Sequence, residues 1–166
     1  MSYANKLFRF GFKEFCDEAK RCQIQGLIIP DLPFDTPEYK ELLAYCSKTG
    51  IELVPVLSPG VSLERLQGYD LGKRKLIYVT STNGITGEQL TIHRELGHLI
   101  KYLRSITKAE LALGFGIASL DDIKQALVIA DVAVIGSQVI RTIDEQGISC
   151  AQTFIKELVK HKGEVK

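Results

Sequence analysis

The sequence predicts an α/β fold with a parallel sheet, and within that class it favours a (β/α)8 TIM barrel over an open sheet. Short continuous apolar runs alternate with longer amphipathic runs along the chain, which is typical of parallel strands joined by helices. The last two apolar runs end in the glycine motifs Gly114–Ile117 and Ile135–Ser137. A barrel carries its phosphate site in the loops after its final strands, so the position of these motifs favours the barrel.

Five apolar runs have the length and continuity of strands that are buried on both faces. They cover residues 27–29, 51–57, 76–79, 111–113 and 132–135. A further strand stub is expected at residues 1–4.

Helices are expected between most of these strands, because apolar residues recur there every three or four positions. The repeating residues are Phe12, Phe15, Cys16 and Ala19; Tyr39, Leu42, Leu43 and Cys46; Leu96, Leu99, Ile100 and Leu103; and Phe154, Ile155, Leu158 and Val159.

Capping residues mark the ends of two expected helices. Asp35 or Thr36 precedes Pro37 and can cap a helix that has proline in its first turn, and Gly50 can end that helix. Ser119 begins another helix, whose first turn is acidic.

The length of the chain leaves two architectures open. The 166 residues predict a single domain, 1–166, which is typical of an open doubly wound sheet. A whole barrel normally needs about 250 residues. An open sheet more often carries its glycine-rich turn after the first strand. No G-x-G-x-x-G follows the first strand here, and no Walker loop is present.

Composition excludes several classes of function. The formal charge of +1 gives no basic stripe for nucleic acid. No apolar stretch approaches the roughly 20 residues of a membrane span, so no membrane partner is expected. No secretory leader is visible, which predicts a cytoplasmic location. The cysteines have no C-x-x-C or zinc spacing and His93 and His98 lack the i, i+4 spacing, so no metal site is predicted.

Five segments together resemble the tryptophan synthase alpha subunit family in order and spacing. They are Tyr3–Asn5, Gly26–Pro33, Ser81–Gly87, Gly114–Ile117 and Ile135–Ser137. The resemblance covers essentially the whole chain, but it begins only at the third strand of the family's barrel. It therefore implies an incomplete TIM barrel that lacks the first strands.

The resemblance implies a lyase of tryptophan biosynthesis that needs no cofactor. Members of the family split indole-3-glycerol phosphate into indole and glyceraldehyde 3-phosphate by retro-aldol chemistry, in which two carboxylates provide the general acid and base. Those carboxylates lie on the second strand and the loop after it, both of which would precede Met1. No residue of this chain is assigned a catalytic role, and the chain alone is expected to be inactive. Asp31 matches a position whose role is more structural than catalytic.

The substrate-binding half of the family's site can be matched residue by residue. The implied phosphate-binding residues are Gly87, Gly114, Gly116, Gly136 and Ser137, and the implied indole-pocket and loop residues are Tyr3, Ile28, Tyr78, Thr86 and Phe115. Glycine lets the backbone approach a phosphate closely, and a serine at a helix start adds a hydroxyl. The simpler alternatives are ordinary turn glycines and ordinary core residues. Thr82 stands where the family usually has arginine.

The resemblance also implies a protein partner, the pyridoxal-phosphate-dependent beta subunit, which receives indole. Pro33–Pro37 matches a loop of that interface, although it can equally be an ordinary connection. Two hypotheses follow: the chain is part of a lyase, or it is a noncatalytic remnant that binds a phosphate ligand or modulates a beta subunit. Unpaired strands at the ends of an incomplete barrel predict self-association.

Overall fold

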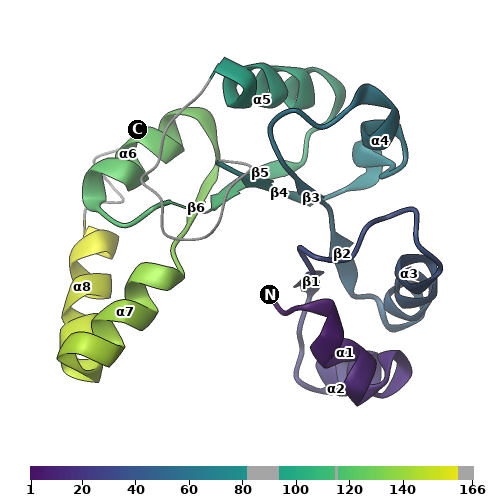
Figure 1. Cartoon of the computed structure of the whole chain (residues 1–166), viewed down its shortest axis with the longest axis horizontal. Helices are drawn as coiled ribbons and strands as arrows, with labels where there is room; N and C mark the ends of the chain where they lie inside the picture. The colour runs from purple at the N-terminus through teal and green to yellow at the C-terminus, as the bar shows by residue number, and fades with distance from the viewer. Residues whose placement is uncertain (82–93, 115, 161–166) are drawn as a thin grey trace.

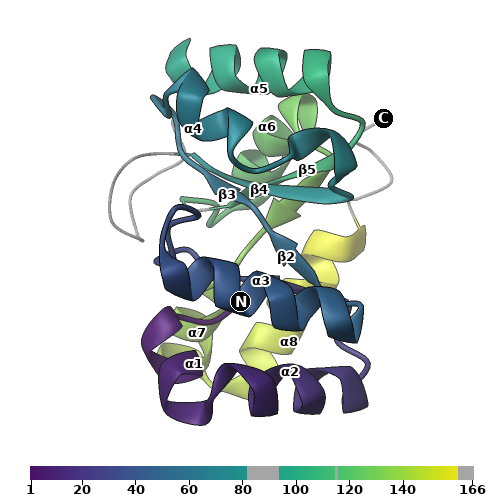
Figure 2. The same cartoon turned by 90° about the vertical axis from the view of Figure 1, so that its right-hand side faces the viewer.

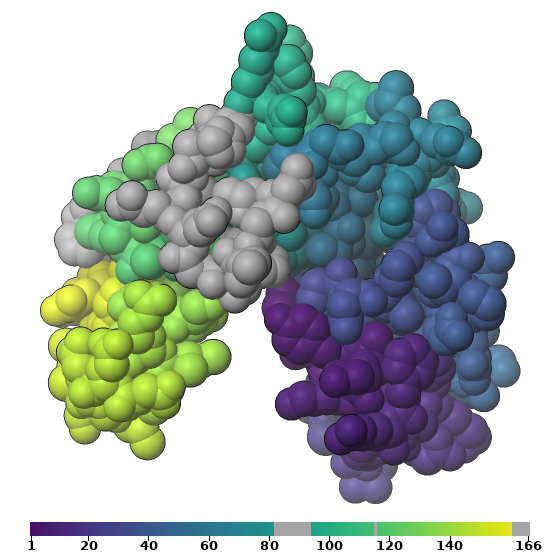
Figure 3. Space-filling model, viewed as in Figure 1, coloured from purple at the N-terminus to yellow at the C-terminus, as the bar shows by residue number. Residues whose placement is uncertain are grey.

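The described strands form two parallel sheets that follow one another along a curve, and the helices lie on the outside of the curve (Figures 1 and 2). The computed structural model describes residues 1–81, 94–114 and 116–160. The curve is open between its first part, with α1 and α2, and its last part, with α7 and α8 (Figure 1). Figure 3 shows the same separation between the purple and yellow parts of the surface.

Within each sheet the strands pair in the order of the sequence, and every pair is parallel. Their bounds are β1 Gly26–Ile28, β2 Glu52–Val54, β3 Val56–Leu57, β4 Leu76–Thr80, β5 Glu110–Gly114 and β6 Val132–Val134. β1 pairs with β2, and β3 begins the order β3-β4-β5-β6. Only Pro55 separates β2 from β3, because proline has no N–H to donate; its carbonyl accepts a hydrogen bond from the Tyr78 N–H at 2.9 Å. The predicted strand at 51–57 is therefore one extended segment that joins the two-stranded sheet to the four-stranded sheet.

The helices follow the predicted apolar patterns. They are α1 Ala4–Phe10, α2 Phe12–Arg21, α3 Pro37–Thr49, α4 Leu63–Gln67, α5 Arg94–Ile106, α6 Leu120–Ile129, α7 Ser137–Gln146 and α8 Ile148–Lys160, with a 3-10 turn at Leu71–Lys73. The sequence patterns did not indicate α1 and α4. α2 packs against α3, and α3 packs against β2 (Figure 2).

The strand stub predicted at residues 1–4 is wrong, because α1 begins at Ala4. One strand-like contact remains, in which the Ser2 N–H donates to the Ile28 carbonyl at 3.0 Å. Tyr3 provides no side-chain cap for α1. Instead Asp31, which follows β1, accepts a hydrogen bond from the Ala4 N–H through Oδ1 at 2.9 Å. A carboxylate distant in sequence thus satisfies a donor that the start of a helix leaves unpaired.

The predicted helix caps are confirmed. Thr36 Oγ1 accepts from the Tyr39 N–H at 3.2 Å, and Gly50 ends α3 with a left-handed φ of 76°. Ser119 and Asp122 form a reciprocal capping box at the start of α6.

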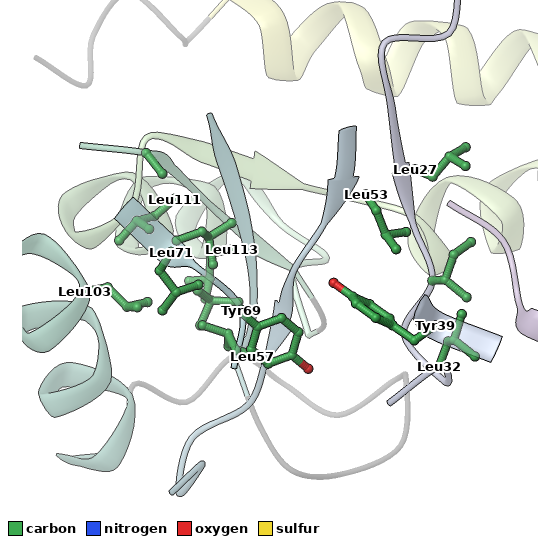
Figure 4. Packing of buried hydrophobic residues seen from close by; sticks show 14 of the residues in the cluster. Leu27, Leu32, Tyr39, Leu53, Leu57, Tyr69, Leu71, Leu103, Leu111 and Leu113 are labelled. Atoms are coloured by element: carbon green, nitrogen blue, oxygen red, sulfur yellow. The ribbon is translucent and has the colours of Figure 1, made fainter. Parts of the chain in front are cut away.

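Alternate residues along each strand face opposite sides of the sheet. On the outer side, Leu27, Leu53, Leu57, Leu111 and Leu113 pack toward the helices, together with residues such as Tyr39 and Leu103 (Figure 4). On the inner side, Val54, Tyr78 and Ala112 form a second buried cluster, against which Ile28, Val56, Leu76 and Val134 pack. The expectation that the strands are buried on both faces holds for β4 and for β5 after Glu110, but not for β6, where Val132 is 37% exposed.

The capping box of α6 provides a test of local stability. Ser119 Oγ accepts from the Asp122 N–H at 3.2 Å, and Asp122 Oδ2 accepts from the Ser119 N–H at 2.9 Å. Ser119→Ala removes the hydroxyl, so we expect the free energy of unfolding to fall by about 1 kcal/mol in urea titrations. The control is Ser105→Ala, since Ser105 is exposed and donates only to the Tyr102 carbonyl near the end of α5. Equal losses of unfolding free energy in the two variants would show that the capping box does not stabilise the protein.

Candidate functional site

The candidate site lies at the carboxyl-terminal edge of β4, β5 and β6. Parallel pairing places Thr80 opposite Gly114, and Gly114 opposite Val134. The loops after the three strands therefore leave the sheet at one edge, which is where barrels and other parallel α/β folds bind their ligands.

The glycine motif after β5 combines close packing with a backbone conformation that only glycine adopts readily. Gly114 is buried at the end of β5, and Gly116 has φ +73°. A Cβ at Gly114 would overlap Oη and Cζ of Tyr78, which lies on the neighbouring strand. Glycine is thus required at position 114 by a neighbouring phenol and at position 116 by the left-handed backbone.

The motif after β6 leads directly into a helix. Gly136 is the N-cap residue of α7 and Ser137 is its first residue; both are exposed. No described atom lies within 4 Å of the place where a Cβ at Gly136 would stand, so packing does not require glycine there. Gly136 contributes no side-chain cap. The first N–H groups of α7 therefore have the positive partial charge, and the open approach, that suit an anion.

The inner face beneath these motifs is apolar apart from the Tyr78 phenol and the Thr80 hydroxyl. Tyr78 is 3% exposed and clusters with Ala112 and the partly buried Ile28. Burial, and to a lesser extent the nearby Tyr3, raises the pKa of Tyr78 to about 12. The phenol is therefore neutral near pH 7, where it can accept or donate a hydrogen bond but cannot act as an anion.

Most of the residues matched by resemblance come together at this edge. Ile28, Tyr78, Gly114, Gly116, Gly136 and Ser137 lie on or just beyond the strands, and Tyr3 influences the ionisation of Tyr78. Gly87, Thr86 and Phe115 lie outside the described residues, so their roles stay predictions.

Acidic residues on the inner side of the described strands stand at the opposite end of the sheet. By alternation with Val54 and Ala112, Glu52 and Glu110 point to this side, but they occupy the amino ends of β2 and β5. Glu52 accepts a hydrogen bond from the Lys75 N–H at 2.9 Å. Asp31 stands beyond the carboxyl end of β1, where one of its oxygens holds the start of α1. This geometry supports the structural role expected for Asp31.

No three His, Cys, Asp or Glu side chains in the described part of the chain are grouped closely enough to hold a metal ion. Among the described helices, none has both the length and the apolar character needed to span a bilayer.

A cavity of about 620 Å³ lies beside the site, between the loops that follow β1 and β3. Its lining includes Pro33, Tyr39, Arg65 and Tyr69. Phe34, in the first of these loops, packs on Tyr69 with ring centroids 4.8 Å apart, and the Arg65 guanidinium lies 5.7 Å from the Phe34 ring centre. These aromatic and cation–π contacts therefore hold the loop of Pro33–Pro37 against α4 and Tyr69.

Comparison with known proteins gives the family. A family model described as tryptophan synthase alpha chain matches residues 1–166. The chain belongs to the tryptophan synthase alpha chain family. The resemblance found in the sequence is thereby confirmed.

Curated relatives agree with this family. The tryptophan synthase alpha chain of Leptospira interrogans is 37% identical over 147 residues, which are 89% of this chain and 56% of the relative. The alpha chain of Leptospira borgpetersenii is 32% identical over 166 residues, or 100% of this chain and 62% of the relative. The chain thus spans less than two thirds of the length of these tryptophan synthase alpha chains.

Solved structures confirm the predicted fold class. The tryptophan synthase subunit alpha from Campylobacter jejuni superposes with a TM-score of 0.80 at 28% identity, covering 94% of this chain and 62% of that one. A structure of the tryptophan synthase α2β2 complex from Pyrococcus furiosus matches with a TM-score of 0.74 at 27% identity, again over 94% and 62%. The open parallel curve corresponds to part of the TIM barrel of the tryptophan synthase alpha chains.

The contact between Gly114 and Tyr78 generates a stability prediction. In Gly114→Ala the new methyl group overlaps the Tyr78 phenol, so we expect a loss of about 1–3 kcal/mol in the free energy of unfolding. The loss should shrink when Tyr78→Ala is added, because the second change removes the overlapping ring. Urea unfolding of the four members of this cycle measures the coupling.

The matched control is Gly97→Ala in α5. No described atom lies within 4 Å of a Cβ at Gly97, so the same chemical change should stabilise the helix by about 0.5–1 kcal/mol. Strictly additive effects of Gly114→Ala and Tyr78→Ala would contradict the proposed overlap.

Proposed function

We propose that this chain provides the substrate-binding part of a tryptophan synthase alpha-type lyase in tryptophan biosynthesis. The proposed substrate is indole-3-glycerol phosphate, which such an enzyme cleaves into indole and glyceraldehyde 3-phosphate. The observation that carries the proposal is the meeting of the two glycine motifs, at Gly114–Gly116 and Gly136–Ser137, beside the Tyr78 phenol at one edge of the sheet. Membership of the family supports the choice of substrate.

The phosphate would be held by backbone N–H groups and by the start of α7. Gly136 leaves open space where a side chain would otherwise stand, and Ser137 adds a hydroxyl at the first helical position. The dipole of α7 favours a dianion at this end. An exposed helix start by itself binds an anion only weakly. The glycine motif after the adjacent strand β5 is therefore needed to complete the proposed phosphate site.

The indole ring would lie on the inner face of the sheet. Ile28, Tyr78 and Ala112 present apolar surface there, and a neutral phenol is compatible with a neutral heteroaromatic ring. Aromatic and aliphatic walls with few polar groups are typical of such pockets.

Cleavage would need carboxylates that the described part of this chain does not place at the site. Along the described strands, the inner-face acids Glu52 and Glu110 lie at the far end of the sheet, and Asp31 is engaged with the start of α1. We therefore propose that the chain by itself binds the substrate without breaking its carbon–carbon bond. This behaviour is shared by the alternative function, a noncatalytic binding module.

The proposed protein partner is a tryptophan synthase beta subunit. One matching structure is described as an α2β2 complex. The loop of Pro33–Pro37 is the proposed contact, because its aromatic residue Phe34 is held by Tyr69 and Arg65 next to a sizeable cavity.

Binding of indole-3-glycerol phosphate is the direct test of the proposed site. We expect calorimetry to detect binding, and Gly136→Asp to weaken it by at least about tenfold, because the new carboxylate would repel the phosphate at the start of α7. The control is Gly72→Asp, since Gly72 is also exposed with no described atom near its Cβ position but lies in a 3-10 turn.

Glyceraldehyde 3-phosphate serves as a second ligand, and release of indole is followed in the same samples. We expect no indole. The proposed function is wrong if calorimetry detects no heat of binding with either ligand. It is also wrong if the parental and Gly136→Asp chains bind with the same affinity.

We also propose that the isolated chain self-associates through the edges of its sheet. β6 pairs on one side with β5, and Val132 on it is 37% exposed. Light scattering should therefore show a dimer or larger assembly, and Val132→Lys should shift it toward monomer because an edge lysine opposes strand pairing. Val128→Lys, on α6 at a residue that is 79% exposed, is the control for added charge. A compact parental monomer that unfolds cooperatively would contradict this proposal.

A further inference from the structure

Thr80 carries a buried hydroxyl that the described part of the fold does not use. It is the last residue of β4 and is 7% exposed. Its Oγ1 has no hydrogen-bond partner among the described parts of the chain. A buried hydroxyl without a partner is unfavourable, and a valine would fill nearly the same volume without this cost. The packing of β4 therefore does not explain why a threonine, and not a valine, stands at this position.

The side chain of Thr80 belongs to the inner face of the sheet. Side chains two residues apart on a strand share a face, so Thr80 is on the same side as Tyr78, whose cluster defines the inner face. Parallel pairing places Thr80 directly beside Gly114. Gly114 has no side chain, and the Tyr78 phenol lies where a Cβ at Gly114 would stand.

The height of Thr80 along the sheet places it between the two parts of the proposed site. Tyr78 and Ala112 lie one layer below, where the indole ring is proposed to bind. Gly116 lies beyond Gly114, where the phosphate is proposed to bind. In a molecule that joins an indole to a phosphate through a glycerol chain, the chain with its hydroxyl groups spans this intermediate layer.

We propose that Thr80 is a substrate-binding residue whose hydroxyl donates a hydrogen bond to an oxygen of the ligand's polyol chain. The inference rests on the proposed function and adds a specificity element to it. It explains why the otherwise apolar run of β4 ends in threonine: the ligand supplies the partner that the described residues do not. A site built to bond a polar group discriminates strongly against ligands that lack it, because its own buried group would stay unpaired.

The test compares Thr80→Val, which replaces the hydroxyl by a methyl group, with Thr80→Ser, which keeps it. With indole-3-glycerol phosphate in calorimetry, Thr80→Val should raise the Kd by about three- to tenfold, the range expected for one neutral hydrogen bond. Thr80→Ser should stay within about twofold of the parental value. Without ligand, the melting temperature of Thr80→Val should equal or exceed that of the parental chain, since no hydrogen bond to the described part of the protein is lost.

Thr142→Val is the matched control. Thr142 is 6% exposed, but its hydroxyl already donates to the Gln138 carbonyl at 2.8 Å within α7. The same chemical change should therefore leave the Kd unchanged. Binding of inorganic phosphate, which has no polyol chain, should be the same in the parental and Thr80→Val chains.

The outcomes separate this inference from the function on which it rests. If Gly136→Asp weakens binding while Thr80→Val does not, the proposed function stands and the role of Thr80 is overturned. A lower melting temperature of ligand-free Thr80→Val would show that the hydroxyl stabilises the fold. If Thr80→Val weakens the binding of inorganic phosphate as much as that of indole-3-glycerol phosphate, the hydroxyl does not bind the polyol chain. Either result overturns the inference. If the parental chain binds no indole-3-glycerol phosphate, both proposals fail together.

Discussion

The parallel register of β4, β5 and β6 is the constraint on which the candidate site depends. Pairing Thr80 with Gly114 and Gly114 with Val134 brings the ends of three strands to one edge. Two glycine motifs that are about twenty residues apart in the sequence then lie after neighbouring strands. A shift of one residue in this pairing would turn the inner and outer faces of a strand around. It would carry the Tyr78 phenol away from the inner face and out of contact with Gly114.

Burial on both faces holds this register in place. The outer leucines of the strands pack against the helices, and the inner cluster around Tyr78 packs across the sheet. Close packing of this kind tolerates little change in volume. At Gly114 even one methyl group would meet the neighbouring phenol. The same glycine that suits a close approach to a ligand is therefore also required by the packing beneath it, so stability and binding are coupled at this residue.

Much of the architecture could be predicted from local patterns. The apolar runs gave the strands, and the caps at Thr36, Gly50 and Ser119 marked helix ends that the structure reproduces. α1 was missed because its start depends on Asp31, which is 27 positions away in the sequence. Local patterns describe contacts within a few residues, whereas this carboxylate reaches the helix only after β1 has taken its place.

The sequence by itself determined the alternation of strands and helices and the two glycine motifs, together with the resemblance that the family match confirmed. These features are local, or are repeated in order among relatives. Only the tertiary structure decided that Tyr78 packs on Gly114 and that the hydroxyl of Thr80 is left without a partner in the described part of the chain. Both depend on which residues stand opposite each other on adjacent strands. Hydrogen bonds between distant segments fix that register, and no pattern within a single strand encodes it.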